Sequence, residues 1–204
     1  MKIVISESQY KRLIETKEKP KILKIPSLKF FNDDWFQLQE FLETKGNPPY
    51  SIGGSLNLKN SPIQSLGNLQ SVGKDLDLEN TPIKSLGNLI SVGGDLNLLG
   101  SPIESLGNLQ SVGGELDLRE TPIKSLGNLQ SVGESLYLSY TPIKSLGNLQ
   151  SVGGDLVLYR TPIESLGNLL SVGGGLDLEG TPLSKMYNEK QIHKMVNVEG
   201  DIYL

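Results

Sequence analysis

The chain has 204 residues, contains no cysteine and carries a formal net charge of −4 at pH 7. This length suffices for one domain with its own hydrophobic core, and the lack of cysteine excludes disulfide bonds and cysteine-ligated metal sites. Residues 51–182 hold thirteen acidic and seven basic groups, and this excess of negative charge disfavours a phosphate-backbone partner. No apolar stretch approaches membrane-spanning length. We therefore expect neither a nucleic acid nor a membrane as partner.

Residues 1–21 form a distinct opening segment. Residues 6–9, Ser-Glu-Ser-Gln, have the spacing of a capping box, which predicts a short helix carrying Tyr10, Leu13 and Ile14. A charged linker follows this helix. Because the first residues contain no long apolar run, we expect no secretory signal peptide.

The same opening segment resembles the short leader found on proteins of large tailed phages. Leu13-Ile14-Glu15 is similar to the L-x-E or I-x-E sequence at which prohead proteases of that group remove a capsid-targeting leader. The resemblance implies a phage or bacterial origin, cleavage after residue 15, and a location in the host cytoplasm or in a virion. The alternative interpretation is an ordinary small helix.

Residues 22–50 are predicted to form an N-terminal helical cap. The polar run 32–34, Asn-Asp-Asp, precedes an amphipathic stretch that contains Trp35, Phe36, Leu38, Phe41 and Leu42. Gly46 and the proline pair 48–49 end it. The next residues, Tyr-Ser-Ile-Gly-Gly, copy a turn of the following repeat and lead into its first strand.

A repeat of 20 residues occupies residues 51–182. Pairs of leucines two residues apart recur once per period, beginning with Leu56 and Leu58 and ending with Leu176 and Leu178. Self-similarity at this period predicts a solenoid in which each copy is one coil and the coils stack.

Residues 75–94 illustrate one coil. The alternation Asp-Leu-Asp-Leu at 75–78 predicts a short strand, and Thr81-Pro82 forms a corner after it. Two further inward-facing edges follow, and the closing pair Gly93-Gly94 is expected to adopt positive φ. No segment has the length of a helix, so we predict strands and turns only. Parallel crossovers favour a right-handed coil.

Two columns of polar residues run through the repeat. Threonine or serine recurs at each corner, from Ser61 to Thr181, and asparagine recurs from Asn68 to Asn168. We expect both columns to hydrogen-bond along the stack.

The spacing L-x-L-x-x-[TS]-x-I-x-x-L-x-x-L, which begins at Leu96 in one coil, resembles the leucine-rich repeat. Threonine or serine replaces the asparagine of that family, and a Val-Gly-Gly run replaces its leading leucine. The resemblance implies a right-handed, leucine-rich-repeat-like parallel β-solenoid that binds partners on its strand-lined face. The short period argues against helices on the opposite side. A parallel β-helix is the neighbouring alternative.

Residues 183–204 are predicted to form the C-terminal cap. Residues 184–196 have an amphipathic pattern that predicts one helix, and residues 197–204 recover the strand of the repeat. The sequence therefore predicts eight stacked strands, seven in the repeat and one at the end.

No residue pattern indicates catalysis or a cofactor. His193 is the only histidine, so the usual pairs of nucleophile and base lack a base. The glycine pairs precede no helix and therefore do not form a phosphate loop. Acidic residues form columns, among them Asp75, Asp95, Glu115, Asp155 and Asp201, which predict either a solvated face or a calcium-binding surface.

The copies differ mainly at outward positions around the first strand. The variable residues on adjacent coils give the candidate partner-binding set Arg119, Tyr137, Tyr140, Val157, Tyr159 and Arg160. Tyrosine and arginine are typical interface anchors, although drift on a solvated face is the plain alternative.

We therefore expect a non-enzymatic protein–protein recognition scaffold. One alternative is a self-associating structural protein, a homodimer that pairs through Ile202, Tyr203 and Leu204 in the C-terminal strand. Another is a surface that binds carbohydrate or calcium.

Overall fold

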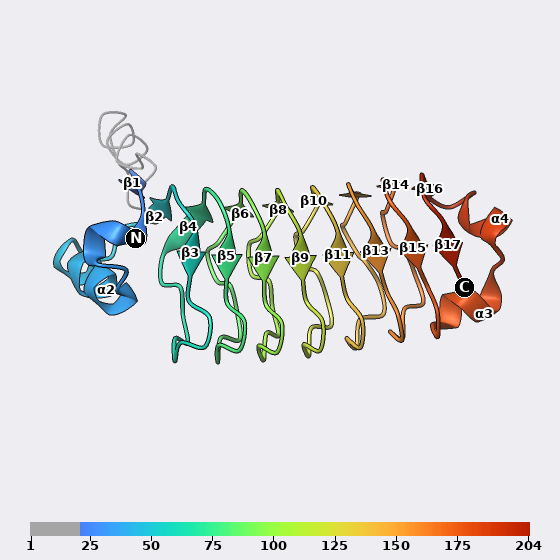
Figure 1. The fold of residues 1–204 in the computed structure, drawn as a ribbon, viewed down its shortest axis with the longest axis horizontal. Helices are drawn as coiled ribbons and strands as arrows, with labels where there is room; N and C mark the ends of the chain where they lie inside the picture. Colours follow the sequence, from blue (N-terminus) through green and yellow to red (C-terminus); the bar gives the residue numbers. More distant parts are fainter. Residues whose placement is uncertain (1–20) are drawn as a thin grey trace, which may run out of the picture.

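Figure 1 shows the computed structural model, which describes residues 21–204. The chain forms a parallel β-solenoid whose coils stack along the long axis of the molecule. Leu136 lies beside Leu116 on one side and Leu156 on the other, so neighbouring coils are in register at a spacing of 20 residues. The expected capping-box helix at Tyr10, Leu13 and Ile14, and the expected cleavage after residue 15, lie outside the described residues.

Two parallel sheets form two sides of the solenoid. Sheet A has nine strands, in the order β1 (Leu23–Ile25), β2 (Tyr50–Ile52), β4 (Leu69–Val72), β6 (Ser91–Val92), β8 (Ser111–Val112), β10 (Ser131–Val132), β12 (Ser151–Val152), β14 (Ser171–Val172) and β16 (Asn197–Val198). Sheet B has eight strands, in the order β3 (Leu56–Asn57), β5 (Leu76–Asp77), β7 (Leu96–Asn97), β9 (Leu116–Asp117), β11 (Leu136–Tyr137), β13 (Leu156–Val157), β15 (Leu176–Asp177) and β17 (Ile202–Tyr203).

Sheet B contains the eight strands that the sequence predicts. Sheet A goes beyond the prediction of one strand per coil. The Ser-Val positions, which were expected to form only an inward-facing edge, form a second continuous sheet. β1 was not predicted, although its alternation of Leu23, Lys24 and Ile25 is the pattern of a half-buried strand. Between Tyr50 and Thr181 the regular elements are all strands, which confirms the prediction that no helix interrupts the repeat.

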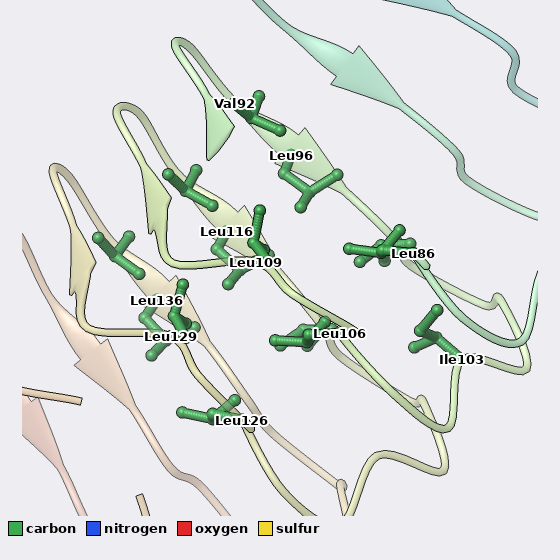
Figure 2. Close-up of a cluster of buried hydrophobic side chains, with 14 of the residues drawn as sticks. Leu86, Val92, Leu96, Ile103, Leu106, Leu109, Leu116, Leu126, Leu129 and Leu136 are labelled. Carbon is green, nitrogen blue, oxygen red and sulfur yellow. The ribbon is translucent and has the colours of Figure 1, made fainter. Parts of the chain in front are cut away.

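The core is a set of aliphatic columns inside the coil. In the coil that starts at residue 75, Leu76, Leu78, Ile83, Leu86 and Leu89 are almost completely buried, as is the following valine. Figure 2 shows the same positions from successive coils stacked on one another. No coil can bury this surface alone, so stacking supplies most of the hydrophobic stabilisation.

Glycine is required at two kinds of position in each coil, for two different physical reasons. Gly93 does not have positive φ, which corrects the expectation for the closing glycine pair. A Cβ at Gly93 would overlap the carbonyl oxygen of Gly73 in the preceding coil, so close stacking of the two backbones excludes a side chain. The positive φ lies instead at the preceding turn, where Gly87 has φ of 58°.

The threonine column acts mainly within each coil. The buried hydroxyl of Thr81 donates to the carbonyl of Leu78 three residues earlier at 2.8 Å, and Thr141 does the same with Leu138 at 2.7 Å. The expectation of bonds along the stack is therefore wrong for these threonines, although Ser101 does reach back to Leu78 in the preceding coil. The asparagine column bridges coils in places, because the Asn88 amide donates to the side chain of Asn68 at 3.1 Å.

Helical segments cover both ends of the stack. At the N-terminal end, a 3-10 helix, η1 (Leu28–Phe31), precedes α2 (Trp35–Thr44). Asp34 caps α2 by accepting hydrogen bonds from the backbone N–H groups of Phe36 and Gln37, as the sequence predicts. Trp35, Leu38 and Leu42 bury the inner face of the helix, so α2 shields the first coil from solvent.

The C-terminal cap contains two short helices, α3 (Pro182–Met186) and α4 (Glu189–Ile192), in place of the single helix predicted over 184–196. The chain is extended at Tyr187, and Asn188 begins a new capping box with Gln191. A polar N-cap within an amphipathic stretch thus divides it into two helices. β16 and β17 then complete the two sheets (Figure 1).

Candidate functional site

The candidate partner-binding residues lie on and beside the outer face of sheet B. We call Arg119, Tyr137, Tyr140, Val157, Tyr159 and Arg160 the aromatic ribbon. Tyr137 on β11 pairs with Val157 on β13, so their side chains are neighbours on the same face of the sheet. The other four residues lie in the turns that follow β9, β11 and β13. The ribbon therefore crosses three adjacent coils.

The position between the two strand leucines has a local structural role in most coils. We call it the between-leucine column. Its asparagine or aspartate side chain accepts a hydrogen bond from the backbone N–H two residues later, as Asp77 does from Glu79 at 3.0 Å. The same bond forms at Asn57, Asn97, Asp117 and Asp177. Tyr137 and Val157 occupy this column, and neither side chain accepts this hydrogen bond, because valine has no acceptor and the tyrosine hydroxyl lies at the far end of its ring, directed to Glu115.

The position three residues further on has a second local role. We call it the corner column, and in all seven coils its residue has positive φ. Four coils have asparagine or glycine there, the residues that tolerate this conformation: Asn60, Asn80, Gly100 and Gly180. The other three coils have Glu120, Tyr140 and Arg160, with φ of 60°, 61° and 54°. These three residues are adjacent in the stack and occupy strained backbone.

Tyr140, Tyr159 and Arg160 form one packed cluster. The rings of Tyr140 and Tyr159 meet edge to face, with centroids 5.6 Å apart and an interplanar angle of 81°. The Arg160 guanidinium lies 5.1 Å from the Tyr159 ring centroid and 6.0 Å from that of Tyr140. Tyr140 is nevertheless 54 % exposed, so the cluster presents an aromatic surface to solvent beside a fixed positive charge.

Arg119 and Tyr137 form a second cluster on the neighbouring coils. The Arg119 guanidinium lies 5.4 Å from the Tyr137 ring centroid and also pairs with Asp117 through two of its nitrogens. The hydrogen bonds to Asp117 raise the pKa of the Arg119 guanidinium further above its ordinary value. The structure thus brings the predicted residues together as two arginine–tyrosine clusters, with Val157 on the sheet beside Tyr137.

A hollow that the sequence analysis missed adjoins the ribbon at Val157. It has a volume of about 470 Å³, and its lining includes Asp155, Gly175, Asp177 and Tyr203. Gly175 stands where the earlier coils have serine, aspartate or glutamate, so a side chain is missing from that place. The glycine that interrupts an otherwise polar column was the sequence signal for this feature.

The acidic column beside the ribbon has a structural explanation. The carboxylate of Asp95 accepts from the backbone N–H of Glu115 in the next coil at 2.8 Å, and Asp155 accepts from Gly175 in the same way at 2.7 Å. Ser135 makes the equivalent bond with its hydroxyl. Within residues 21–204 no group of three histidine, aspartate or glutamate side chains is arranged to hold a metal ion.

The remaining predicted residues lie at the C-terminal end. Ile202 and Tyr203 form β17, which pairs with β15, and the side chain of Ile202 is partly buried. Tyr203 and Leu204 are 51 % and 43 % exposed. His193 follows α4, and its Nε2 lies 3.7 Å from a carboxylate oxygen of Glu189.

In the part of the chain that the structure describes, no helix combines the length and apolar character needed to span a membrane. Comparisons with protein families, with curated proteins and with solved structures found no match to this chain. The molecule is therefore described by its architecture, a leucine-rich β-solenoid with a period of 20 residues.

Proposed function

We propose that the protein is a non-enzymatic recognition scaffold that binds a protein partner through the aromatic ribbon. The observation that carries the proposal is the coincidence of two local departures on the same coils. Tyr137 and Val157 forgo a turn hydrogen bond that five other coils make, and Tyr140 and Arg160 occupy backbone that asparagine or glycine prefers. Random drift on a solvated face gives no reason for such departures to coincide.

The composition of the ribbon supports a protein partner. Tyrosine and arginine supply large contact areas at a modest cost in conformational entropy and are enriched among the residues that dominate binding energy. The contacts of Arg160 with two rings hold the cluster in one arrangement before binding, which reduces the entropy lost on association. A leucine-rich-repeat relationship, suggested by the L-x-L-x-x-[TS] spacing, belongs to the same proposal, because that family binds partners on its strand-lined face.

A capture experiment tests the proposal. The wild type is compared with a variant in which Tyr137, Tyr140 and Tyr159 are all changed to serine. The matched control changes Gln110, Gln130 and Gln150 to serine, three exposed residues beside sheet A. We expect a protein that the wild type and the control retain and the tyrosine variant loses. Equal retention by all three chains, at equal thermal stability, would reject the ribbon as the binding surface.

Self-association through β17 is the second candidate. Within the described residues β17 pairs only with β15, so the backbone N–H and C=O of Ile202 face away from the sheet without a strand partner. Light scattering across a concentration series would detect pairing as a rise in mass. The change Ile202→Pro removes the outward N–H and should keep the protein monomeric. A monomeric mass for the wild type at every concentration excludes this candidate.

A further inference from the structure

A second surface with the features of a binding site lies in the N-terminal cap, at the end of the solenoid that β1 and α2 form (Figure 1). It is a groove with a volume of about 860 Å³ between β1 and the C-terminal half of α2. Its apolar lining consists of Ile22, Leu23, Phe41 and Pro48, and its lysines are Lys21, Lys24 and Lys45. We call this surface the cap groove.

The cap groove adjoins β1, the first strand of sheet A. The N–H of Leu23 and the C=O of Ile25 form hydrogen bonds with the residues that flank β2, at 2.9 and 2.8 Å. Successive residues of a strand direct their backbone groups to opposite edges, so the N–H and C=O of Lys24 point away from β2. Within residues 21–204 β1 has no other strand partner. This edge can therefore accept one more strand.

The lining places a fixed apolar surface beside this edge. Ile22 is 45 % exposed directly before β1, and Phe41 on α2 is only partly buried against the core. The Phe41 ring packs against that of Phe31, with centroids 5.3 Å apart, which holds it in place. A strand added beside β1 directs every second side chain to one face, so apolar side chains on that face can contact Ile22 and Phe41.

The charge of the groove identifies the kind of partner. Its lining contains three lysines and no acidic residue. In the repeat, by contrast, Lys59 pairs with Glu79 of the next coil at 2.6 Å. In the part of the chain that the structure describes, Lys21, Lys24 and Lys45 form no ion pair. Their positive charge is therefore available to the carboxylates of a partner.

The same charge disfavours the chain's own opening residues as the occupant. Residues 1–20 carry five basic and three acidic groups, so their net charge has the same sign as that of the groove. Like charges brought together at an interface cost free energy, whereas an acidic segment of another protein gains it.

We propose that an extended, acidic segment of a protein partner adds to sheet A beside β1 and fills the cap groove. Its backbone bonds to the outward N–H and C=O of Lys24, its apolar side chains pack against Ile22 and Phe41, and its carboxylates lie near the three lysines. This interaction goes beyond recognition by the aromatic ribbon and is independent of it, because the ribbon lies within residues 119–160.

Binding of defined peptides to the full chain tests the proposal. The probe is a short fluorescent peptide in which valine and glutamate alternate, and its matched control carries lysine in place of glutamate. We expect fluorescence anisotropy to report binding of the glutamate peptide that weakens as the salt concentration rises, and binding of the lysine peptide that is at least about ten-fold weaker. No binding of the glutamate peptide, or equal affinity for the two peptides, would overturn the proposal.

Two variants of one residue test the use of the strand edge. Lys24→Pro removes the outward N–H, whereas Lys24→Ser removes the same charge and keeps the N–H. At equal thermal stability, we expect the proline variant to bind the glutamate peptide several-fold more weakly than the serine variant. Equal affinities would show that the backbone of β1 takes no part, and strand addition would be rejected.

A charge reversal tests whether the groove, rather than the surface as a whole, attracts the peptide. Lys21→Glu combined with Lys45→Glu should weaken binding at least about ten-fold. The matched control, Lys74→Glu combined with Lys124→Glu, reverses two exposed lysines of the repeat and should leave the affinity unchanged. Equal losses in the two double variants would overturn the proposal.

Sedimentation of the peptide-free chain examines a second copy as the occupant. We expect a mass that Lys24→Pro does not alter at any concentration. A rise in mass with concentration that Lys24→Pro abolishes would show that another copy pairs with β1, which contradicts the proposal. Because none of these variants changes the ribbon, failure of peptide binding and failure of capture by the ribbon are separate results.

Discussion

The strain in the corner column predicts that replacing Glu120 with asparagine stabilises the protein. Glu120 has φ of 60°, and an L-residue with a longer side chain pays roughly 1–2 kcal/mol in this conformation. Asparagine avoids part of that cost, and Asn80 occupies the equivalent place two coils earlier with φ of 54°. The reciprocal change Asn80→Glu should therefore destabilise the protein by a similar amount.

The expected gain is small because the change has one opposing contribution. Glu120 is exposed, and its charge lies near that of Arg119, an interaction between exposed groups that is worth a few tenths of a kcal/mol. Subtracting it leaves a net stabilisation of about 0.5–1 kcal/mol for Glu120→Asn. For a chain of this size such a change raises Tm by about 1–4 °C.

Thermal and urea unfolding of the two single variants and the wild type provide the test. The slope of the urea transition must stay constant, because a solenoid can lose cooperativity between its coils. Opposite changes in Tm for Glu120→Asn and Asn80→Glu would support the account. A lower Tm for Glu120→Asn would show that Glu120 is not strained. The residues other than asparagine or glycine in the corner column would then give no support to selection for binding.

Three further predictions concern the scaffold. Gly133→Ala places a Cβ on the carbonyl oxygen of Gly113 and should lower the free energy of unfolding by about 3 kcal/mol. Gly87→Ala has open space around the new Cβ but φ of 58°, so it should lower that free energy by only about 1 kcal/mol. Equal losses for the two variants in urea unfolding would contradict the stacking explanation. Thr141→Val removes the buried hydroxyl that donates to Leu138 and should cost about 1 kcal/mol in thermal unfolding, and an unchanged Tm would show that this bond contributes nothing. Burial raises the pKa of the Tyr50 hydroxyl above that of an unfolded tyrosine, so the folded state favours the protonated form. The stability that this shift provides is complete below about pH 10 and is lost as the pH rises further. The free energy of unfolding, measured between pH 9 and 11, should therefore fall more steeply in the wild type than in Tyr50→Phe.

The scaffold was predictable because one strong regularity determines it. A period of 20 residues with leucines at fixed places specifies stacked coils, and the register of Leu136 between Leu116 and Leu156 follows from that period. Local chemistry also identified α2, since Asp34 is a favourable N-cap directly before an amphipathic stretch. The location of the ribbon residues on adjacent coils follows from their spacing.

Other features depend on contacts that spacing does not reveal. Positive φ lies at Gly87 rather than at the closing pair Gly93-Gly94, because the close approach of the preceding coil, not turn geometry, requires glycine at Gly93. The division of the C-terminal helix at Asn188 depends on a competition between capping and helix continuation, which periodicity does not measure.

Within the candidate site, the sequence identified the variable residues, but it did not reveal the turn hydrogen bond and the backbone conformation that other residues at these positions favour. The hydrogen bond from Glu79 to Asp77 and the positive φ of Asn80 define local rules, and only the structure shows that Tyr137 and Tyr140 break them. The position of Arg160 beside both tyrosine rings likewise depends on turn geometry.

One measurement tests the central claim, that the ribbon is kept for binding at the expense of local conformational preference. A variant with Tyr137→Asn, Tyr140→Asn, Val157→Asn and Arg160→Gly restores the residues that the same columns use in other coils. Its thermal unfolding and its capture of protein are compared with those of the wild type in parallel. The account predicts a Tm equal to or above that of the wild type together with loss of capture. Retained capture, or a fall in Tm of several degrees, would contradict it.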